Sequence, residues 1–451
     1  MNNFLAIILL FLLAACSVGN RSGGRAGVGL ANGGQDLDDG SQLEGSDLDS
    51  TEDVEPGETD SEDDTNDASV DDDVTVVPAV VDPLPNDTLE REAWLRRQVA
   101  RGGTVVLPAA DFVLRQALDL PSNLRLEGQV GTVIYLQTNG FFTNQNPSII
   151  GDSNSVGIRI QGRQNVVVHN LTIRLMRVNG NIAENRFVRG ITVRNSSNVT
   201  VTSNDLAEFS LANGIITVDS SSDVYLGYNN IHDCYSNYTG GSRGQITGIT
   251  VDDNRINGVA STRMTIERNV IRRLAVGSDF EARWGYETDG INVAGVLTSG
   301  LMILNNDIHD VGEGIDVFGS QNTIRCNEVQ RARLFGIKLV HGASDNNIIG
   351  NRLVSSGMAE IVIAGSAVAC NGAMRNYVFR NELRGVQSVG VLFVANGGDQ
   401  CPGSTGRPIN NSIEENAVLL SGPVEFAVTN GYQNNFRDNM TNPQNFTRPC
   451  N

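Results

Sequence analysis

Three carboxylic acids and one lysine stand at corresponding places in a short repeated phrase of the sequence. The phrase is Gly-Ile, a variable residue, and Val or Leu, and it occurs at residues 190–193, 248–251, 290–293, 314–317 and 336–339. Asp289 and Glu313 directly precede the glycine, whereas Asp316 and Lys338 fill the variable position. If the phrases stack as neighbouring strands, these side chains meet, because adjacent strands lie ~4.8 Å apart.

A cluster of like carboxylates is unfavourable unless a cation or a substrate compensates the repulsion, which also raises the pKa of each acid. Oxygen ligands of this kind suit Ca²⁺. We therefore predict a calcium site formed by Asp289, Glu313 and Asp316, with Lys338 beside it. An acidic residue before glycine is also ordinary turn chemistry, so a purely structural role stays open.

Three functions are compatible with this cluster. In the first, calcium neutralises a uronate carboxylate, and Lys338, its pKa lowered by the cation, removes the neighbouring C–H proton in a β-elimination. In the second, Asp289 and Asp316 are the acid and base of an inverting glycoside hydrolase. In the third, the chain is a non-catalytic glycan-binding or surface solenoid. Lys338 is the only lysine among 33 basic residues, which favours a specific role for it.

Aromatic and basic residues occur in two long segments between the repeats that flank the cluster. Such side chains stack on sugar rings and pair with carboxylates, so we expect them to line a groove for an acidic polysaccharide. The predicted substrate-binding residues are Tyr238, Arg283, Trp284, Tyr286, Asn292 and His341.

A second repeat predicts the elements that position these residues. Asparagine followed two places later by Leu, Ile or Val occurs at Asn204, Asn229, Asn269, Asn306, Asn327, Asn351, Asn381 and Asn416. The intervals run from 21 to 40 residues. The shortest match one coil of a parallel β-helix, and the longer ones add a loop. The pattern predicts about ten coils, with stacked asparagines that bond to backbone groups in the turns.

In this architecture Ile and Val of the Gly-Ile phrase point inward, so the variable position points outward, and we expect it to face solvent. Equivalent positions form one column, which consists of Thr192, Thr217, Thr250, Asn292, Asp316, Lys338, Val362 and Leu392. The column is polar up to Lys338 and apolar beyond it.

The charge distribution separates a tail from the folded part. The chain has 451 residues and a formal net charge of −19. Residues 36–87 hold 20 acids and no Lys or Arg, whereas the residues from Ala93 onward hold 30 acids and 30 bases. The folded part is therefore neutral, and no basic patch favours nucleic acid as a partner. We expect a monomer.

The N-terminus is predicted to be an export signal. Residues 4–15 form an apolar run too short to span a membrane as a mature helix. The sequence Leu13-Ala14-Ala15-Cys16 resembles the lipobox of bacterial lipoproteins. This resemblance implies a signal peptide over residues 1–16 and a lipid anchor on Cys16 in the outer membrane or at the cell surface; an ordinary cleaved signal peptide is the alternative. Residues 17–87 have few apolar side chains, which predicts a disordered acidic tether.

The folded region, residues 88–451, begins with a predicted capping helix. Residues 88–99 are amphipathic and Gly102-Gly103 ends the pattern. Residues 103–108 and 118–128 resemble the first coils of pectin-lyase-like proteins. This resemblance implies an all-β fold, a right-handed parallel β-helix solenoid with an N-terminal capping helix.

Short stretches around the acids resemble carbohydrate-active β-helix enzymes. Residues 287–291 and 336–338 are similar to polygalacturonase motifs, although the Asp-Asp and Gly-His-Gly motifs of that family are missing between them. The order Asp289, residues 313–316, Lys338 resembles family-9 pectate lyases, in which acids hold calcium and a lysine is the base. Residues around Glu313 are similar to chondroitinase B-like alginate lyases, but Phe318 and Val340 stand where their catalytic Lys and Arg would fall.

Five cysteines follow Cys16, namely Cys234, Cys326, Cys370, Cys401 and Cys450. Export permits disulfides, and Cys370 and Cys401 follow equivalent strands of successive coils. We therefore predict a Cys370–Cys401 disulfide; unpaired small side chains are the alternative.

Overall fold

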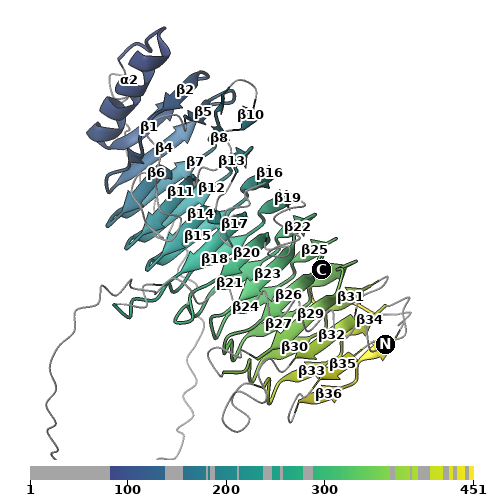
Figure 1. Ribbon diagram of the computed structural model, residues 1–451. Helices are drawn as coiled ribbons and strands as arrows, with labels where there is room; N and C mark the ends of the chain where they lie inside the picture. Colours follow the sequence, from purple (N-terminus) through teal and green to yellow (C-terminus); the bar gives the residue numbers. More distant parts are fainter. Residues whose placement is uncertain are drawn as a thin grey trace, which may run out of the picture. The chain divides into compact units, whose positions relative to one another are not determined.

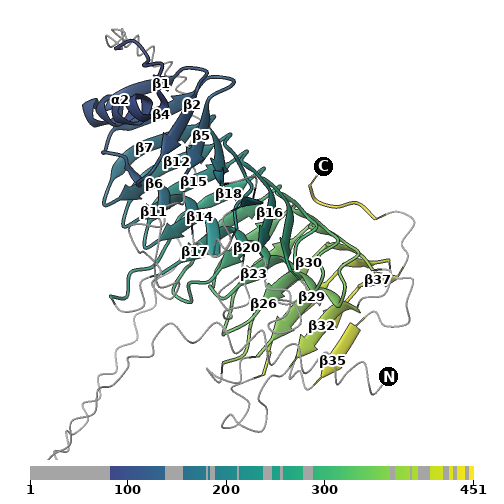
Figure 2. The same ribbon diagram turned by 45° about the horizontal axis from the view of Figure 1, so that its top comes forward.

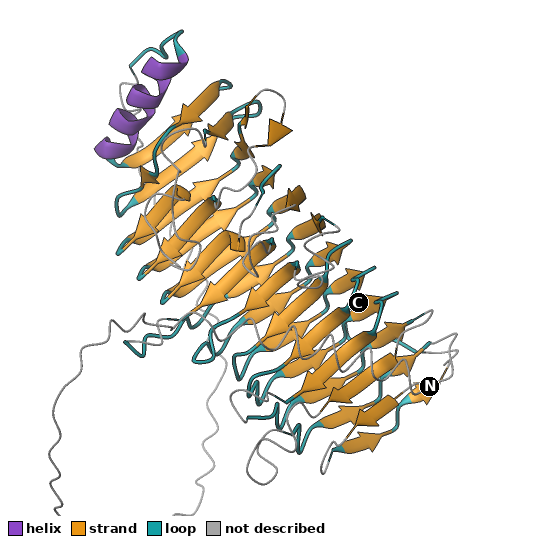
Figure 3. Cartoon of the chain, viewed as in Figure 1, coloured by secondary structure: helices purple, strands orange, loops and turns teal. Residues whose placement is uncertain are grey.

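The computed structural model describes residues 82–137, 156–178, 181–182, 188–210, 213–236, 246–253, 257–277, 288–365, 371–385, 389–394, 407–419, 426–429, 434–441 and 446–450. Within them one helix precedes a right-handed parallel β-helix built from three sheets (Figures 1 and 3). The predicted fold class is confirmed. No helix among these residues is long and apolar enough to cross a membrane.

The capping helix α2 (Thr88–Arg101) forms where the sequence predicts it. The Asp87 side chain caps its first turn by accepting hydrogen bonds from the backbone N–H groups of Leu89 and Glu90. Trp94 is buried and its ring packs on Phe112, with 6.1 Å between ring centroids. The helix therefore covers the apolar end of the first coil, as Figure 2 shows from another side.

Sheet A is one of three parallel sheets that run along the solenoid. In spatial order its strands are β1 (Gly103–Leu107), β4 (Leu124–Gly128), β7 (Gln164–His169), β12 (Ser197–Thr202), β15 (Ser222–Gly227), β18 (Thr265–Glu267), β21 (Met302–Leu304), β24 (Thr323–Arg325), β27 (Asn347–Ile349), β30 (Tyr377–Phe379), β33 (Ser412–Glu414) and β36 (Asn435–Arg437).

Sheet B follows sheet A within each coil. Its strands are β2 (Asp111–Leu114), β5 (Val133–Leu136), β8 (Thr172–Leu175), β13 (Asp205–Ala207), β16 (Asn230–Ser236), β19 (Val270–Val276), β22 (Asp307–His309), β25 (Glu328–Gln330), β28 (Arg352–Val354), β31 (Glu382–Arg384), β34 (Ala417–Val418) and β37 (Met440–Thr441). A short antiparallel pair, β9 (Arg177–Val178) and β10 (Asn181–Ile182), extends from one coil.

Sheet C completes each coil and carries the Gly-Ile phrases. Its strands are β3 (Leu118–Asp119), β6 (Val156–Gln161), β11 (Arg189–Arg194), β14 (Asn213–Asp219), β17 (Thr247–Asp252), β20 (Asp289–Val293), β23 (Glu313–Val317), β26 (Phe335–Leu339), β29 (Ala359–Ala364), β32 (Val389–Val394) and β35 (Phe426–Thr429). The described residues thus hold twelve strands in each of two sheets and eleven in the third. The coils exceed the roughly ten expected, because the first coils lack the asparagine phrase.

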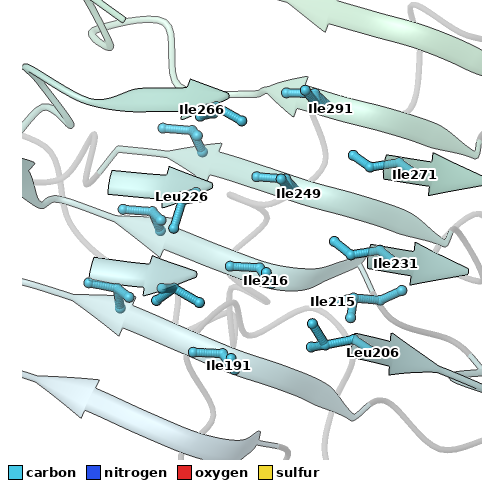
Figure 4. Close-up of a cluster of buried hydrophobic side chains, with 14 of the residues drawn as sticks. Ile191, Leu206, Ile215, Ile216, Leu226, Ile231, Ile249, Ile266, Ile271 and Ile291 are labelled. Atoms are coloured by element: carbon cyan, nitrogen blue, oxygen red, sulfur yellow. The ribbon is translucent and has the colours of Figure 1, made fainter. Parts of the chain in front are cut away.

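The interior is filled by aliphatic side chains that repeat from coil to coil. Ile191, Ile216, Ile249 and Ile291 of sheet C are directly paired in register and fully buried. Figure 4 shows them opposite Leu206, Ile231 and Ile271 of sheet B, with Leu226 and Ile266 of sheet A beside them. This stacking fixes the register, since a slip of one residue would turn the aliphatic side chains outward.

The predicted asparagine ladder is present in the turns between sheets A and B. Each side-chain N–H₂ donates to the side-chain oxygen of the asparagine on the next coil at 2.9–3.0 Å. The ladder comprises Asn204, Asn229, Asn269, Asn306, Asn327, Asn351, Asn381, Asn416 and Asn439. The sequence repeat therefore corresponds to a continuous ladder of buried asparagine side chains whose amide groups are hydrogen-bonded.

A disulfide joins Cys326, in the turn after β24, to Cys450 near the C-terminus. The pairing was not predicted. Gly350 occupies the equivalent turn of the next coil, and a side chain there would collide with Cys450. Cys234 is buried and unpaired. Cys370 and Cys401 lie outside the described residues, so the predicted bond between them stays a prediction.

Candidate functional site

The four charged residues of the Gly-Ile phrases meet on neighbouring strands of sheet C. Asp289 of β20 pairs in register with Glu313 of β23, and Asp316 of β23 pairs with Lys338 of β26. The whole column from Thr192 to Leu392 is in the predicted register. Because the strands are parallel and in register, residues far apart in the chain become side-chain neighbours.

The contacts within this group are short. Lys338 Nζ lies 2.6 Å from Glu313 Oε2 and 2.9 Å from Asp316 Oδ2. Asn292 Nδ2 donates a 2.8 Å hydrogen bond to Asp289 Oδ2. Lys338 thus bridges two acids rather than pairing with Asp316 alone, and Asn292 orients the third.

Thr288 fixes the relative position of the first two strands of the site. Its hydroxyl oxygen accepts a 2.6 Å hydrogen bond from the backbone N–H of Gly312. Its carbonyl oxygen accepts a 2.9 Å bond from the backbone N–H of Glu313. Thr288 is fully buried, and it therefore ties the start of β20 to the start of β23, where Asp289 and Glu313 stand. The Thr-Asp-Gly sequence was its only signal.

The expectation that this column faces solvent is wrong. Asp289 and Glu313 are 1% exposed, Asp316 is 3% and Lys338 is 7% exposed. The residues do point away from the coil interior, but this side of sheet C is covered as well. Beside Lys338 it carries a second apolar cluster made of Phe335, Val340, Ala359, Val362 and Ala364, with Phe318, Leu334 and Met358 packed against it.

Burial and mutual repulsion change the proton affinities of the group. Burial raises the pKa of Asp289 well above its usual value, and the charges of Glu313 and Asp316 raise it further. Burial, partly offset by the Lys338 ammonium, raises the pKa of Asp316 to about 7. Burial disfavours the charged form of Lys338, but the carboxylates outweigh it and the pKa of Lys338 lies well above its usual value.

The donor set fits a divalent cation. One oxygen from each of Asp289, Glu313 and Asp316 lies within 4.8 Å of the others. Glu313 Oε1 and Asp316 Oδ1 are buried without a hydrogen-bond partner among the described residues. With Lys338 the group carries a formal charge of −2 when all are ionised. Oxygen-only ligands with this charge suit Ca²⁺.

The remaining predicted site residues are only partly described. His341 follows β26 and its ring meets Phe318 edge-on at 4.6 Å between centroids, so it lies toward the apolar cluster. Arg283, Trp284, Tyr286 and Tyr238 lie outside the described residues, as does Cys16. Their assignment to a substrate groove and to lipidation stays a prediction.

Comparisons with known proteins bear on the fold. No family model and no curated protein matches the sequence. A variant of the periplasmic alginate epimerase AlgG is similar in structure at 11% identity, with a TM-score of 0.50 over 75% of this chain and 83% of that chain. The A-module of mannuronan C-5 epimerase AlgE6 of Azotobacter vinelandii gives 17% identity and a TM-score of 0.48 over 82% of this chain and 98% of that chain.

PfbA, a surface adhesin of Streptococcus pneumoniae, is also similar, with 13% identity and a TM-score of 0.48 over 82% of this chain and 92% of that chain. At these identities the similarity concerns the fold alone. A shared fold does not determine function, so the function has to be argued from the site.

Proposed function

We propose that the chain is an exported calcium-binding protein that cleaves an acidic polysaccharide by β-elimination. The observation that supports this is the buried group of Asp289, Glu313 and Asp316, two of whose oxygens lack partners among the described residues. Such a group is unfavourable without a compensating cation or reaction, and strongly shifted acids gather at functional sites.

Calcium held by these acids would neutralise a uronate carboxylate and acidify the adjacent C–H. Lys338 is the base: its Nζ takes the proton, the electron pair left on carbon forms a C=C bond, and the glycosidic oxygen leaves. In the structure Glu313 and Asp316 hold Nζ protonated. Lys338 therefore becomes basic only when these ion pairs are broken. The burial of the group also requires that the covering above it opens for the substrate.

The spacing of the acids argues against an inverting hydrolase. Such enzymes keep their two carboxyl groups roughly 6.5–9.5 Å apart to leave room for a water. The nearest oxygens of Asp289 and Asp316 lie within 4.8 Å of each other.

A non-catalytic glycan-binding solenoid is the second candidate. It is favoured by the two ion pairs of Lys338, which keep a proton on the only lysine. In that case the acids and Lys338 serve binding or rigidity, and calcium links the protein to an acidic glycan without chemistry.

One assay separates these functions. The full chain is incubated with pectate, alginate and glycosaminoglycan substrates, and the ultraviolet absorbance of unsaturated products is followed with calcium and with a chelator. A lyase gives absorbance that the chelator abolishes and calcium restores. Chelator-sensitive binding without absorbance identifies the binding protein. The absence of calcium binding in a titration, together with no activity and no glycan binding, rejects the proposal.

Substitution of Lys338 by Arg tests the base directly. Lys338→Arg retains a cation for Glu313 and Asp316, but a guanidinium holds its proton with a pKa above ~12. We expect the rate on the best substrate to fall at least ~100-fold, while the Tm stays near that of the parent. Full activity of the variant contradicts a lysine base.

We further propose that the chain reaches the cell surface or outer membrane through a lipid on Cys16. Labelling with a radioactive fatty acid and membrane fractionation should detect the anchor. The Cys16→Ala variant should lose the label and leave the membrane fraction. A labelled or still membrane-bound variant argues for another means of attachment.

A further inference from the structure

The outer face of sheet C changes character at Lys338. On the side of the N-terminal coils the column consists of Thr192, Thr217, Thr250 and Asn292, in direct register with one another and with Asp316. On the other side the next position is Val362, which belongs to the apolar cluster with Phe335 and Val340. The metal centre therefore stands at the end of a polar track.

Several polar atoms of this track lack partners. The hydroxyl oxygens of Thr192 and Thr250 and the amide oxygen of Asn292 are buried without a hydrogen bond among the described residues. These side chains are only 5–7% exposed. Buried unpaired polar atoms are rare in folded proteins and unfavourable, so three of them within four coils of one column, two of these on adjacent coils, require a reason.

We infer that this track binds the end of an acidic polysaccharide chain, which runs from the metal centre toward the N-terminal coils only. The inference rests on the proposed function and adds the direction and the end specificity of the substrate. Since the track is covered, the sugar chain displaces what packs over it as it binds.

The chemistry of the unpaired atoms favours a polyhydroxylated ligand. The amide oxygen of Asn292 needs a donor, and a threonine hydroxyl can donate and accept. Sugar hydroxyls meet both needs, whereas a carboxylate or phosphate alone cannot donate to Asn292 and an apolar ligand satisfies neither. Coils repeat every ~4.8 Å, so the track offers contacts at regular steps along an extended chain.

The apolar cluster explains why the chain stops. Val362 offers no hydrogen-bonding group where the track would continue, and Phe335 and Val340 pack around it. A sugar chain crossing this point would lose its hydration without gaining partners. The geometry points to a protein that works from a chain end rather than at internal bonds.

Near-isosteric exchanges of Thr and Val on both sides of the metal centre test the track. Binding of size-defined pectate and alginate oligomers to the full chain is measured for Thr192→Val and Thr250→Val. We expect each to weaken oligomer binding about three- to tenfold, to leave calcium binding unchanged, and to give a Tm equal to or above the parent, because an unpaired hydroxyl is removed. A purely structural threonine would not combine weaker binding with unchanged or greater stability.

Two matched controls use the same exchange. The Thr217 hydroxyl already donates to the carbonyl oxygen of Gly214 at 3.1 Å, so Thr217→Val should lower the Tm, in contrast to Thr192→Val and Thr250→Val. Val362→Thr, on the apolar side, should leave affinity unchanged. An effect of Val362→Thr on affinity equal to that of Thr250→Val overturns the one-sided track.

The remaining outcomes separate this inference from the proposed function. If the parent binds the oligomers and Thr192→Val and Thr250→Val bind them equally well, the two hydroxyls bond to water rather than to the sugar. This result rejects the track but leaves the proposed function standing. If the parent is active, an end-labelled oligomer should release short fragments from one end at the earliest times, and random internal cleavage rejects end specificity. A parent that binds no uronate oligomer rejects the proposed function and the track with it.

Discussion

The asparagine ladder and the acidic group on sheet C both bury polar side chains on successive coils, but they differ in how completely these side chains are hydrogen-bonded. In the ladder, Asn306 makes four side-chain hydrogen bonds, accepting from the backbone and side chain of Asn269 and donating to Ile266 and Asn327. In the acidic group, Glu313 Oε1 and Asp316 Oδ1 have no hydrogen-bond partner among the described residues.

The presence or absence of hydrogen-bond partners distinguishes structural from functional polar residues more clearly than burial does. The ladder recurs on nine coils and its bonds are complete, as expected of a device that holds the solenoid together. The acidic group occupies three strands and leaves like charges face to face. A repeated and satisfied polar residue indicates stability, whereas a local and unsatisfied one indicates a ligand.

Removing a ladder residue should have the largest effect on stability. Asn306→Ala removes four buried hydrogen bonds, including those that satisfy the backbone N–H of Asn269 and the carbonyl oxygen of Ile266, and we expect a loss of about 3–5 kcal/mol in the free energy of unfolding. The midpoint of urea unfolding measures it. Asn347, exposed on sheet A, is the matched control, and Asn347→Ala should change stability by less than about 0.5 kcal/mol. Equal losses of stability in Asn306→Ala and Asn347→Ala would contradict the special structural role of the ladder.

Breaking the disulfide should show which coils of the ladder are the least stable. Cys450 ties the C-terminus to Cys326, four turns before the last ladder member. We expect Cys450→Ser to cost about 2–4 kcal/mol and to speed hydrogen exchange in residues 407–441 but not in residues 188–236. Cys326→Ser should behave identically, since it breaks the same bond. Uniform loss of protection would show that the solenoid unfolds as one unit.

The sequence predicts the register of the asparagine ladder and of the acidic group, but it does not predict that the acidic group is buried. Each coil repeats its phrase, so the alignment of Asp316 with Lys338 and of Asn306 with Asn327 follows from counting residues. The burial of Asp316 depends on what packs over sheet C, which no repeat encodes.

The contacts of the tail and of Lys338 are equally non-local. The pairing of Cys326 with Cys450 depends on a tail that folds back over 124 residues, and only the glycine at position 350 hints at its path. The side chain of Lys338 reaches Asp316 on the neighbouring strand and also Glu313, which stands three residues before Asp316 on that strand.

The acidic group should make stability depend on pH with a definite sign. The pKa of Asp316 is raised to about 7 and that of Asp289 is also raised, so between about pH 4 and 7 the folded chain binds protons that the unfolded chain has lost. Stability in a chelator should therefore fall as the pH rises through this window, by up to about 1.4 kcal/mol per pH unit for each proton. Thermal unfolding from pH 4 to 8 checks it.

Calcium and one variant sharpen the pH experiment. Calcium binds the ionised acids, so it should raise the Tm most at pH 7 and above. Asp316→Asn should flatten the pH dependence and reduce the gain from calcium. A parent whose stability rises with pH between 4 and 7 in chelator would contradict the raised pKa values.

The smallest effect should come from a polar contact that is neither buried nor unsatisfied. Arg375 and Asp345 form a two-point ion pair at 2.7 Å between turns of neighbouring coils, but their side chains are 53% and 37% exposed. Water solvates both charged groups when the pair is broken, so Arg375→Ala should lower the free energy of unfolding by no more than about 1 kcal/mol. A double-mutant cycle with Asp345→Ala should give a coupling energy that shrinks in 1 M salt, where the screening length falls to about 3 Å. A coupling energy that rivals the loss in Asn306→Ala and resists salt would mean that this surface pair, and not only the asparagine ladder, holds neighbouring coils together.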